Sequence, residues 1–207
     1  MPEQPIKENN EQPQVPFSVA REIKIHYPEY WGIQRYPATE CAAFCKVDNK
    51  WGILGNYARI PIVVNDVKFK KTEQLFQLMK FRDAEAVQAV YEANNPKMTA
   101  KHWQKNGYCR PDWGGMMIDA MKFCLLKKYE QSQGFRDELE RSKVRFIVED
   151  QTTFPKKEPN AWGMKLRDDG FFEGPNVMGR LLMELRDKGT LEYQLPNDAL
   201  DFIDLLR

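Results

Sequence analysis

The segment KTEQLFQLMKF, residues 71–81, has the composition of a short helix, because it is made of good helix formers and contains neither Gly nor Pro. Thr72 is a suitable N-cap residue, so we expect the helix to begin there. At ~100° per residue, Glu73, Gln77 and Lys80 fall within an arc of ~60° on such a helix. The apolar residues of the segment point elsewhere and can pack into a core: Leu75, Phe76 and Met79.

The polar face of this helix presents an acid, an amide and an amine in a row. Glu73 and Lys80 lie ~10 Å apart along the axis, which is too far for the mutual support that Glu and Lys give each other at a spacing of three or four residues. This spacing leaves room for a ligand between the tips of the two side chains. The alternative interpretation is an ordinary solvated face without a function.

The chain has 207 residues, which is long enough for one well-filled domain and short for two. Because its start is rich in Pro, Gln, Glu and Asn, we expect a flexible N-terminal tail over residues 1–19 and a single domain over residues 20–207. The 31 basic and 30 acidic residues give a formal charge of +1, which argues against a broad basic surface for binding nucleic-acid duplexes. Any contact with nucleic acid should therefore be local.

The chain has four cysteines and two histidines: Cys41, Cys45, Cys109, Cys124, His26 and His102. The cysteines have no CxxC spacing and lie among apolar neighbours, as reduced buried thiols do. Two histidines exclude a multi-histidine metal centre and give little support to a Ser-His-Asp or Cys-His site. We expect no metal and no cofactor. No segment approaches ~18 apolar residues and no apolar signal core is seen, so we expect an intracellular, soluble protein without a membrane span, in a compartment left open.

Alternating apolar residues predict strands, and amphipathic spacing predicts helices. Strands are expected near Arg21, in a hairpin over residues 60–69 that turns at Asn65 and Asp66, and over residues 145–150. Further helices are expected over residues 83–94, 96–107, after the segment CRPDWGG, over 135–140, over 176–189 and from Asn197. Residues 151–175 lack periodicity and should form a long ordered loop. The sum is a helix-rich α+β domain with a small, mostly antiparallel sheet.

The chain contains no P-loop, no GxGxxG after a strand, no GxSxG and no HExxH. Five segments, in order, instead resemble the NADAR family of YbiA-like N-glycosidases: GILGNYARIPIVV, KTEQLFQLMKF, RPDW, FIVED followed by AWG, and GPNVMGRLLMELR. The resemblance runs from about Gly52 to Arg186. Several separate matches in one order are more specific than any single match, so the resemblance implies a YbiA-like fold and favours a ligand-binding role for the polar face.

Members of this family cut N-glycosidic bonds. One branch acts on a phosphorylated pyrimidine intermediate of riboflavin synthesis, and another acts on ADP-ribosylated guanine. In both substrates the bond joins a base to ribose C1, where positive charge develops as the bond breaks, so the resemblance implies that Glu73 stabilises this charge or carries a proton. A lysine kept neutral by burial can attack the aldehyde to which a ribose opens, so we expect Lys80 to form a transient Schiff base at C1.

A second acid is expected after the strand at residues 145–150. Glu149 matches the acid that relatives carry there, and Asp150 follows it. Relatives commonly have an Asp three residues before the Trp-Gly pair, where this chain has Pro159 beside Glu158. Glu149, Asp150 and Glu158 are all candidates for activating water, and the sequence leaves the choice open. The pair is followed by MKLRDDGFFEG, which is longer and more aromatic than the linker of relatives, and we expect it to alter the substrate.

Other residues are predicted to contact the substrate. Trp113 and Trp162 offer flat faces on which a base can stack, with core packing as the alternative. Arg110 and Arg180 can reach phosphate oxygens. The amides that follow Asn176 at the start of a helix are a candidate seat for a diphosphate. The remaining predicted contacts are Asn56, Gln77 and Gly179.

We therefore predict a hydrolase that removes ADP-ribose from ADP-ribosylated guanine in DNA or RNA, with ADP-ribose as the product. The aromatic insertion at Phe171 and Phe172 and the candidate phosphate contacts favour this large substrate. One alternative is an N-glycosidase acting on the riboflavin intermediates. Another is a non-catalytic protein that binds ADP-ribose. No obligate protein partner is indicated, and no pattern decides between DNA and RNA.

Overall fold

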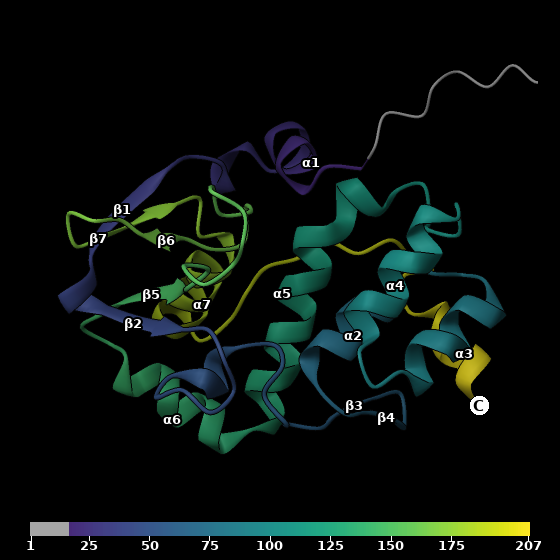
Figure 1. Cartoon of the computed structure of the whole chain (residues 1–207). Helices are drawn as coiled ribbons and strands as arrows, with labels where there is room; N and C mark the ends of the chain where they lie inside the picture. Colours follow the sequence, from purple (N-terminus) through teal and green to yellow (C-terminus); the bar gives the residue numbers. More distant parts are fainter. Residues whose placement is uncertain (1–16) are drawn as a thin grey trace, which may run out of the picture.

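The long helix α5 (Trp113–Gln131) runs through the middle of the molecule (Figure 1). The structure is a computed structural model that describes residues 17–207, so residues 1–16 of the predicted tail lie outside the described residues. On one side of α5 are α2 (Thr72–Leu78), α3 (Ala84–Glu92) and α4 (Pro96–Lys105). On the other side are α7 (Val177–Lys188), β1 (Gln34–Pro37), β2 (Cys41–Phe44), β5 (Phe146–Glu149), β6 (Lys165–Leu166) and β7 (Phe171–Gly174).

The strands of the described chain form three small sheets where the sequence predicted one. An antiparallel sheet has the order β1-β7-β6, and β3 (Ile62–Val64) and β4 (Val67–Phe69) form the expected hairpin. The third sheet pairs β2 with β5 in parallel, from Cys41 opposite Phe146 to Phe44 opposite Glu149. The α+β class with mostly antiparallel pairing is confirmed.

Local capping and turn signals placed most elements correctly. Asn65 and Asp66 have φ values of 46° and 64°, as a tight hairpin turn requires. The Asp83 side chain accepts a hydrogen bond from the Ala86 amide at the start of α3, and Asn95 caps α4 in the same way. The helices predicted after CRPDWGG and around 135–140 are α5 and α6 (Gln133–Arg141).

The strand predicted near Arg21 is wrong, because these residues form helix α1 (Val19–His26). The Ser18 hydroxyl accepts a hydrogen bond from the Arg21 amide at 3.4 Å and caps the helix. Ile23 is fully buried, whereas Ile25 is 61% exposed, so the alternate residues do not share one buried face. The apparent strand period was an incidental feature of an amphipathic helix.

The predicted helix at residues 71–81 exists, but its ends differ from the prediction. Lys71 occupies the N-cap position, and Thr72 is the first residue of the helix. The Thr72 hydroxyl is buried and does not cap the helix. The amide of Glu73 donates instead to the Asn56 carbonyl at 3.0 Å, so a neighbouring loop satisfies the helix start. Because α2 ends at Leu78, Lys80 lies just beyond the helix.

The long loop predicted over residues 151–175 contains the hairpin of β6 and β7, which was not expected. Phe172 is 5% exposed and packs with Val148 and Met164, while the Phe171 ring lies 4.0 Å from the Arg35 guanidinium. The aromatic insertion therefore builds a sheet. The last segment also differs, since it is the 3-10 helix η4 (Asp201–Leu206) and not an α-helix from Asn197.

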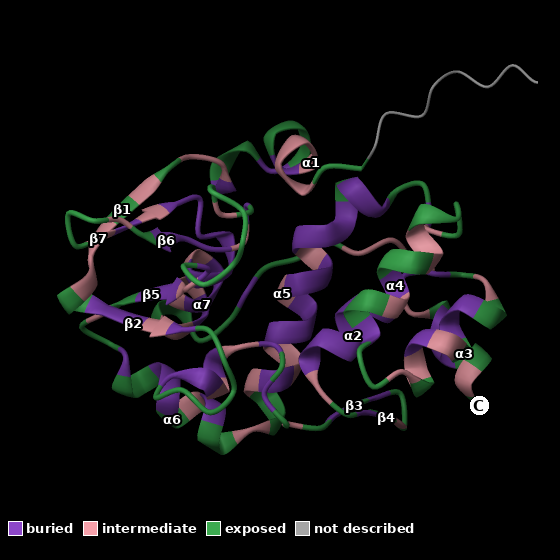
Figure 2. Cartoon of the chain, viewed as in Figure 1, coloured by how far each residue is buried: buried purple, intermediate pink, exposed green. Residues whose placement is uncertain are grey.

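The main hydrophobic core surrounds α5, most of which is buried, as is all of α2 (Figure 2). Side chains from all parts of the described chain meet in it, among them Ile23, Leu75, Ile118, Leu181 and Phe202. None of the helices within residues 17–207 combines the length and apolar character needed to span a bilayer.

Candidate active site

A cavity of about 340 Å³ lies between α2 and α4 on one side and β2, β5 and the loop before α7 on the other. Its size falls within the range of ~300–1,000 Å³ that is usual for small-molecule sites. Seven of the predicted site residues line it: Asn56, Glu73, Gln77, Lys80, Trp113, Glu149 and Trp162. Phe76, which we expected to point only into the core, also lines it. The cavity thus brings the polar face of α2 opposite the end of β5.

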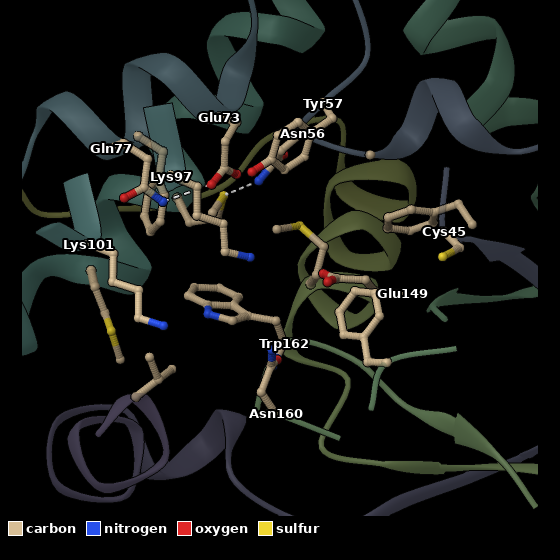
Figure 3. A pocket seen from close by; sticks show the side chains of 18 of the residues that line it. Cys45, Asn56, Tyr57, Glu73, Gln77, Lys97, Lys101, Glu149, Asn160 and Trp162 are labelled. Carbon is tan, nitrogen blue, oxygen red and sulfur yellow. Dashed lines mark hydrogen bonds between the residues drawn. The ribbon is translucent and has the colours of Figure 1, made fainter. Parts of the chain in front are cut away.

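The polar face of α2 is buried and directed into the cavity (Figure 3). The Gln77 side-chain amide donates to the Glu73 carboxylate at 2.8 Å, which fixes both side chains. Within residues 17–207, Gln77 Oε1 and Asn56 Oδ1 are buried and have no hydrogen-bond partner. Buried polar atoms are nearly always paired, so these two oxygens are suited to accept hydrogen bonds from a ligand.

Lys80 reaches the same cavity from the turn after α2. Its Nζ lies 3.5 Å from Gln104 Oε1 and 5.4 Å from the centre of the Trp113 ring. The Arg110 amide donates to the Lys80 carbonyl at 2.8 Å and holds the backbone of this turn. Burial lowers the pKa of Lys80 to about 8, although the charges of Cys109 and Glu73 act in the opposite direction. The amine is still mainly protonated at neutral pH, but its neutral fraction is much larger than that of an ordinary lysine.

Glu149 stands at the end of β5, across the cavity from α2 (Figure 3). Burial raises the pKa of its carboxyl, whereas the hydrogen bond from Gln151 Nε2 at 3.1 Å lowers it. The charge of Glu73 also raises the pKa of Glu149, so the two acids lie within electrostatic range of each other. Such an acid is a better base than an ordinary exposed carboxylate.

Asp150 and Glu158, the other two predicted acids, do not line the cavity. Asp150 accepts a hydrogen bond from the Thr152 amide at 2.8 Å and closes a turn. Glu158 is exposed and pairs with Arg167 at 2.5 Å. Of the three candidates that the sequence left open, only Glu149 reaches the cavity.

Neither Arg110 nor Arg180 lines the cavity, and most of the donors predicted to bind phosphate are used inside the protein, although Arg180 Nη1 is buried without a partner among the described residues. Arg110 is buried and binds the carboxylates of Asp112 and Asp198 at 2.6 and 2.8 Å. Arg180 donates to the Glu29 carbonyl at 2.6 Å. The first two amides of α7, the expected diphosphate seat, donate to the carbonyls of the preceding loop at 3.1 and 3.0 Å.

Asn176 and Gly179 support the site without lining it. The Asn176 side chain donates to the Ile147 carbonyl at 2.8 Å and accepts from the Glu149 amide at 3.2 Å. A Cβ atom on Gly179 would lie 2.1 Å from the Ile147 carbonyl oxygen, so only glycine lets α7 approach β5 this closely. Both residues hold the strand end that carries Glu149.

Sequence reasoning missed the polar face of α4, formed by Lys97, Lys101 and Gln104. These residues recur at helical spacing, which is the same signal that revealed the face of α2. The amines of Lys97 and Lys101 point into the cavity (Figure 3). The charge of Lys97 lowers the pKa of both Lys80 and Glu149, which places it near both groups.

Sequence reasoning also missed Lys128, a fully buried residue of α5. Its Nζ donates to the carbonyls of Ile53 and Gly55 at 2.7 and 2.9 Å. A lysine in an apolar core can be satisfied in this way, by backbone oxygens alone. Lys128 thus fixes the turn that leads into Asn56.

Comparison with known proteins identifies the family. The NADAR domain family matches residues 43–188, which is more than half of the chain. N-glycosidase YbiA of Escherichia coli (strain K12) is 28% identical over 151 residues, which is 72% of this chain and 88% of the relative. N-glycosidase Npun_R5314 of Nostoc punctiforme is 24% identical over 149 residues, 70% of this chain and 90% of the relative.

Among solved structures, the NMR structure of Escherichia coli YbiA is similar, with a TM-score of 0.57 at 26% identity. The alignment covers 72% of this chain and 83% of that one. The match of the family to residues 43–188 includes all seven cavity residues that the sequence had predicted. The chain therefore belongs to the NADAR domain family.

Proposed function

We propose that this protein hydrolyses the N-glycosidic bond of ADP-ribosylated guanine in nucleic acid and releases ADP-ribose. The general reaction is supported by the names of its relatives, which are N-glycosidases. The observation that carries the proposal is the meeting of the Glu73 carboxylate and the Lys80 amine in one cavity, beside two tryptophans. An acid and a neutral amine are the groups that cleavage at ribose C1 through a Schiff base requires.

In the first step, the neutral amine of Lys80 forms a bond to C1 as the bond from C1 to the base breaks. The base leaves with the bonding electrons, and Glu73 passes to it the proton that the attacking nitrogen gives up. The ribose ring then opens as the remaining proton on the Lys80 nitrogen moves to O4, which leaves an imine on Lys80. Water adds to C1, and Glu149 takes a proton from it and returns it to the nitrogen. Lys80 leaves as the free amine with the second proton of the water, and O4 closes on the aldehyde, so that the products are the free base and a ribose with a hydroxyl on C1.

The lysines of the cavity suit an anionic substrate. The charged residues that line the cavity are Lys46, Glu73, Lys80, Lys97, Lys101 and Glu149. Lys97 and Lys101 are about one turn apart on α4, a rise of ~6 Å, so they can contact two adjacent phosphates. Trp162 supplies a flat apolar surface for a heterocycle, whereas Trp113 is only 2% exposed and packs against Phe76. The support for a substrate with a diphosphate thus comes from the lysines of α4, and not from Arg110, Arg180 or the amides of α7.

A second candidate substrate is the phosphorylated pyrimidine riboside of riboflavin synthesis. A cavity of about 340 Å³ is near the lower end of the usual range, which favours a small monophosphate. The same groups would act on it, because its base is also joined to ribose C1. The two substrates differ in the number of phosphates and in the size of the group that is left on the sugar.

Chromatography of the products separates these proposals. Purified protein is incubated with ADP-ribosylated DNA, with ADP-ribosylated RNA and with the riboflavin intermediate. We expect free ADP-ribose and unmodified guanine from a nucleic-acid substrate. Cleavage of the riboflavin intermediate alone would select the second candidate. Binding of ADP-ribose in calorimetry without any cleavage would mean that the protein is a non-catalytic reader.

A further inference from the structure

Part of the cavity wall comes from outside the region that matches the NADAR family. Phe17 and Val19 line the cavity, but the family match begins only at residue 43. These two side chains stand at the start of α1, with Ser18 as the capping residue between them. Residues 43–188 alone therefore do not supply this part of the cavity wall.

The N-terminal segment is fixed in place by contacts with α5. The Tyr27 hydroxyl donates to the Gly115 carbonyl at 2.5 Å and lies 3.0 Å from an Asp119 carboxylate oxygen. A Cβ atom on Gly114 would lie 2.2 Å from the Glu22 carboxylate, so the Glu22 side chain lies directly against the backbone at the start of α5. Figure 1 shows α1 lying across the N-terminal end of α5.

A second anchor ties the residues after α1 to helix α7. The Tyr30 hydroxyl donates to Glu184 Oε2 at 2.8 Å, and the Arg180 guanidinium donates to the Glu29 carbonyl. With one attachment to α5 and another to α7, the segment has a defined position relative to the cavity. The N-terminal segment is therefore an ordered part of the cavity wall.

The position of this wall also gives it a chemical role. Helix α5 begins with Trp113, so the turn on which α1 rests is the turn that carries one of the two cavity tryptophans. Phe17 lines the cavity and is still 40% exposed, which places its ring at the opening. An aromatic ring and a valine at the opening form an apolar edge, in contrast to the exposed lysines of α4 and to the buried acid Glu73.

We propose that Phe17 and Val19 form a base-contacting wall that sets the substrate preference of the cavity. The substrate class rests on the proposed function: the ribose lies against Lys80 and Glu73, and the heterocycle extends toward Phe17. Base stacking on an aromatic side chain strengthens binding measurably, whereas a ring at the opening has no part in the bond cleavage. Phe17 is therefore a specificity residue and not a catalytic one.

Calorimetry on the full chain tests this wall without relying on turnover. The probes are guanosine monophosphate, which carries a base, and ribose 5-phosphate, which does not. We expect Phe17→Ala to weaken guanosine monophosphate binding about fivefold or more, and Phe17→Tyr to restore it. Ribose 5-phosphate binding should stay the same. Ile25→Ala is the matched control, because Ile25 lies on α1 and is 61% exposed.

The outcomes separate this inference from the proposed function. The proposed base contact is contradicted if the wild type and Phe17→Ala bind guanosine monophosphate equally well, or if neither binds it. An equal loss for both probes also overturns it, since the effect would then not concern the base. If guanosine monophosphate binds as expected but no N-glycosidic substrate is cleaved, the base contact of Phe17 is supported and the proposed hydrolysis is contradicted.

Discussion

Lys80 has to lose its proton before it can act as a nucleophile, and burial lowers its pKa to about 8. The neutral fraction of the amine grows as the pH rises through this value. We therefore expect kcat/KM to increase through a pH of about 8 and then to level off. Steady-state rates between pH ~6 and ~10 measure this. A profile that is flat, or that falls over this range, contradicts a neutral amine as the reacting form.

Glu73 is buried with its carboxylate directed into the cavity, so its removal should affect chemistry more than folding. We expect Glu73→Gln, which keeps the shape of the side chain, to lower kcat by ~10²–10⁴. The melting temperature should stay close to that of the wild type, as differential scanning fluorimetry can show. Glu85→Gln, at an exposed position of α3, is the control and should keep full activity. Full activity of Glu73→Gln would exclude the role assigned to this acid.

The sequence predicted the acid and the amine from residues that lie within one short segment. It could not separate Glu149 from Asp150 and Glu158, because only the fold shows that the end of β5 faces the cavity and that the other two acids do not. The misplaced arginine has the same kind of cause. The Arg110 guanidinium binds Asp112, which is two residues away, and also Asp198, which is 88 residues away and could not be paired with it from the sequence.

At the level of single elements, α4 supplies cations to the site from one of its faces. We expect Lys97→Ala and Lys101→Ala each to raise KM about three- to tenfold with little change in kcat, because they remove a contact to phosphate and leave the reacting groups in place. Both effects should shrink at high salt. Lys105→Ala is the matched control, since Lys105 is exposed on the same helix and does not line the cavity. An unchanged KM in both variants would remove α4 from the phosphate site.

The packing of α7 against β5 depends on Gly179. A Cβ atom would meet the Ile147 carbonyl at 2.1 Å, so Gly179→Ala must push the two elements apart. We expect a loss of about 1–3 kcal/mol in the free energy of unfolding, measured by urea denaturation. Gly134→Ala is the comparison: its nearest contact would be 3.5 Å from Ile53, and it should stabilise α6 by up to about 1 kcal/mol. Equal stability of the two variants would contradict this account of Gly179.

Elements with local signals were predictable, and elements with distant partners were not. Asp83 and Asn95 cap their helices through residues three positions along the chain. The hairpin of β6 and β7 was missed because it is completed by β1, which pairs Gln34 with Gly174. The helix α1 was mistaken for a strand because both patterns put apolar residues at positions 23 and 27, and only packing on α5 decides between them.

At the scale of the whole molecule, the site exists only because two groups of elements meet around α5. Glu73 and Lys80 come from the segment at α2, Glu149 comes from β5, and Phe17 comes from the start of the described chain. The sequence identified Glu73, Lys80 and Glu149 as candidates, but their spacing in the chain does not show that they lie in one cavity. What it did provide was the order of the five NADAR-like segments, which the family match over residues 43–188 now covers.

The central claim is that the Lys80 amine becomes joined to ribose C1 during the reaction. Incubation with ADP-ribosylated DNA in the presence of borohydride, followed by mass spectrometry of the digested protein, measures this directly. We expect a ribose-derived adduct on the peptide that contains Lys80, and none in Lys80→Ala. An adduct on another residue, or base release by Lys80→Ala at the wild-type rate, would contradict the account.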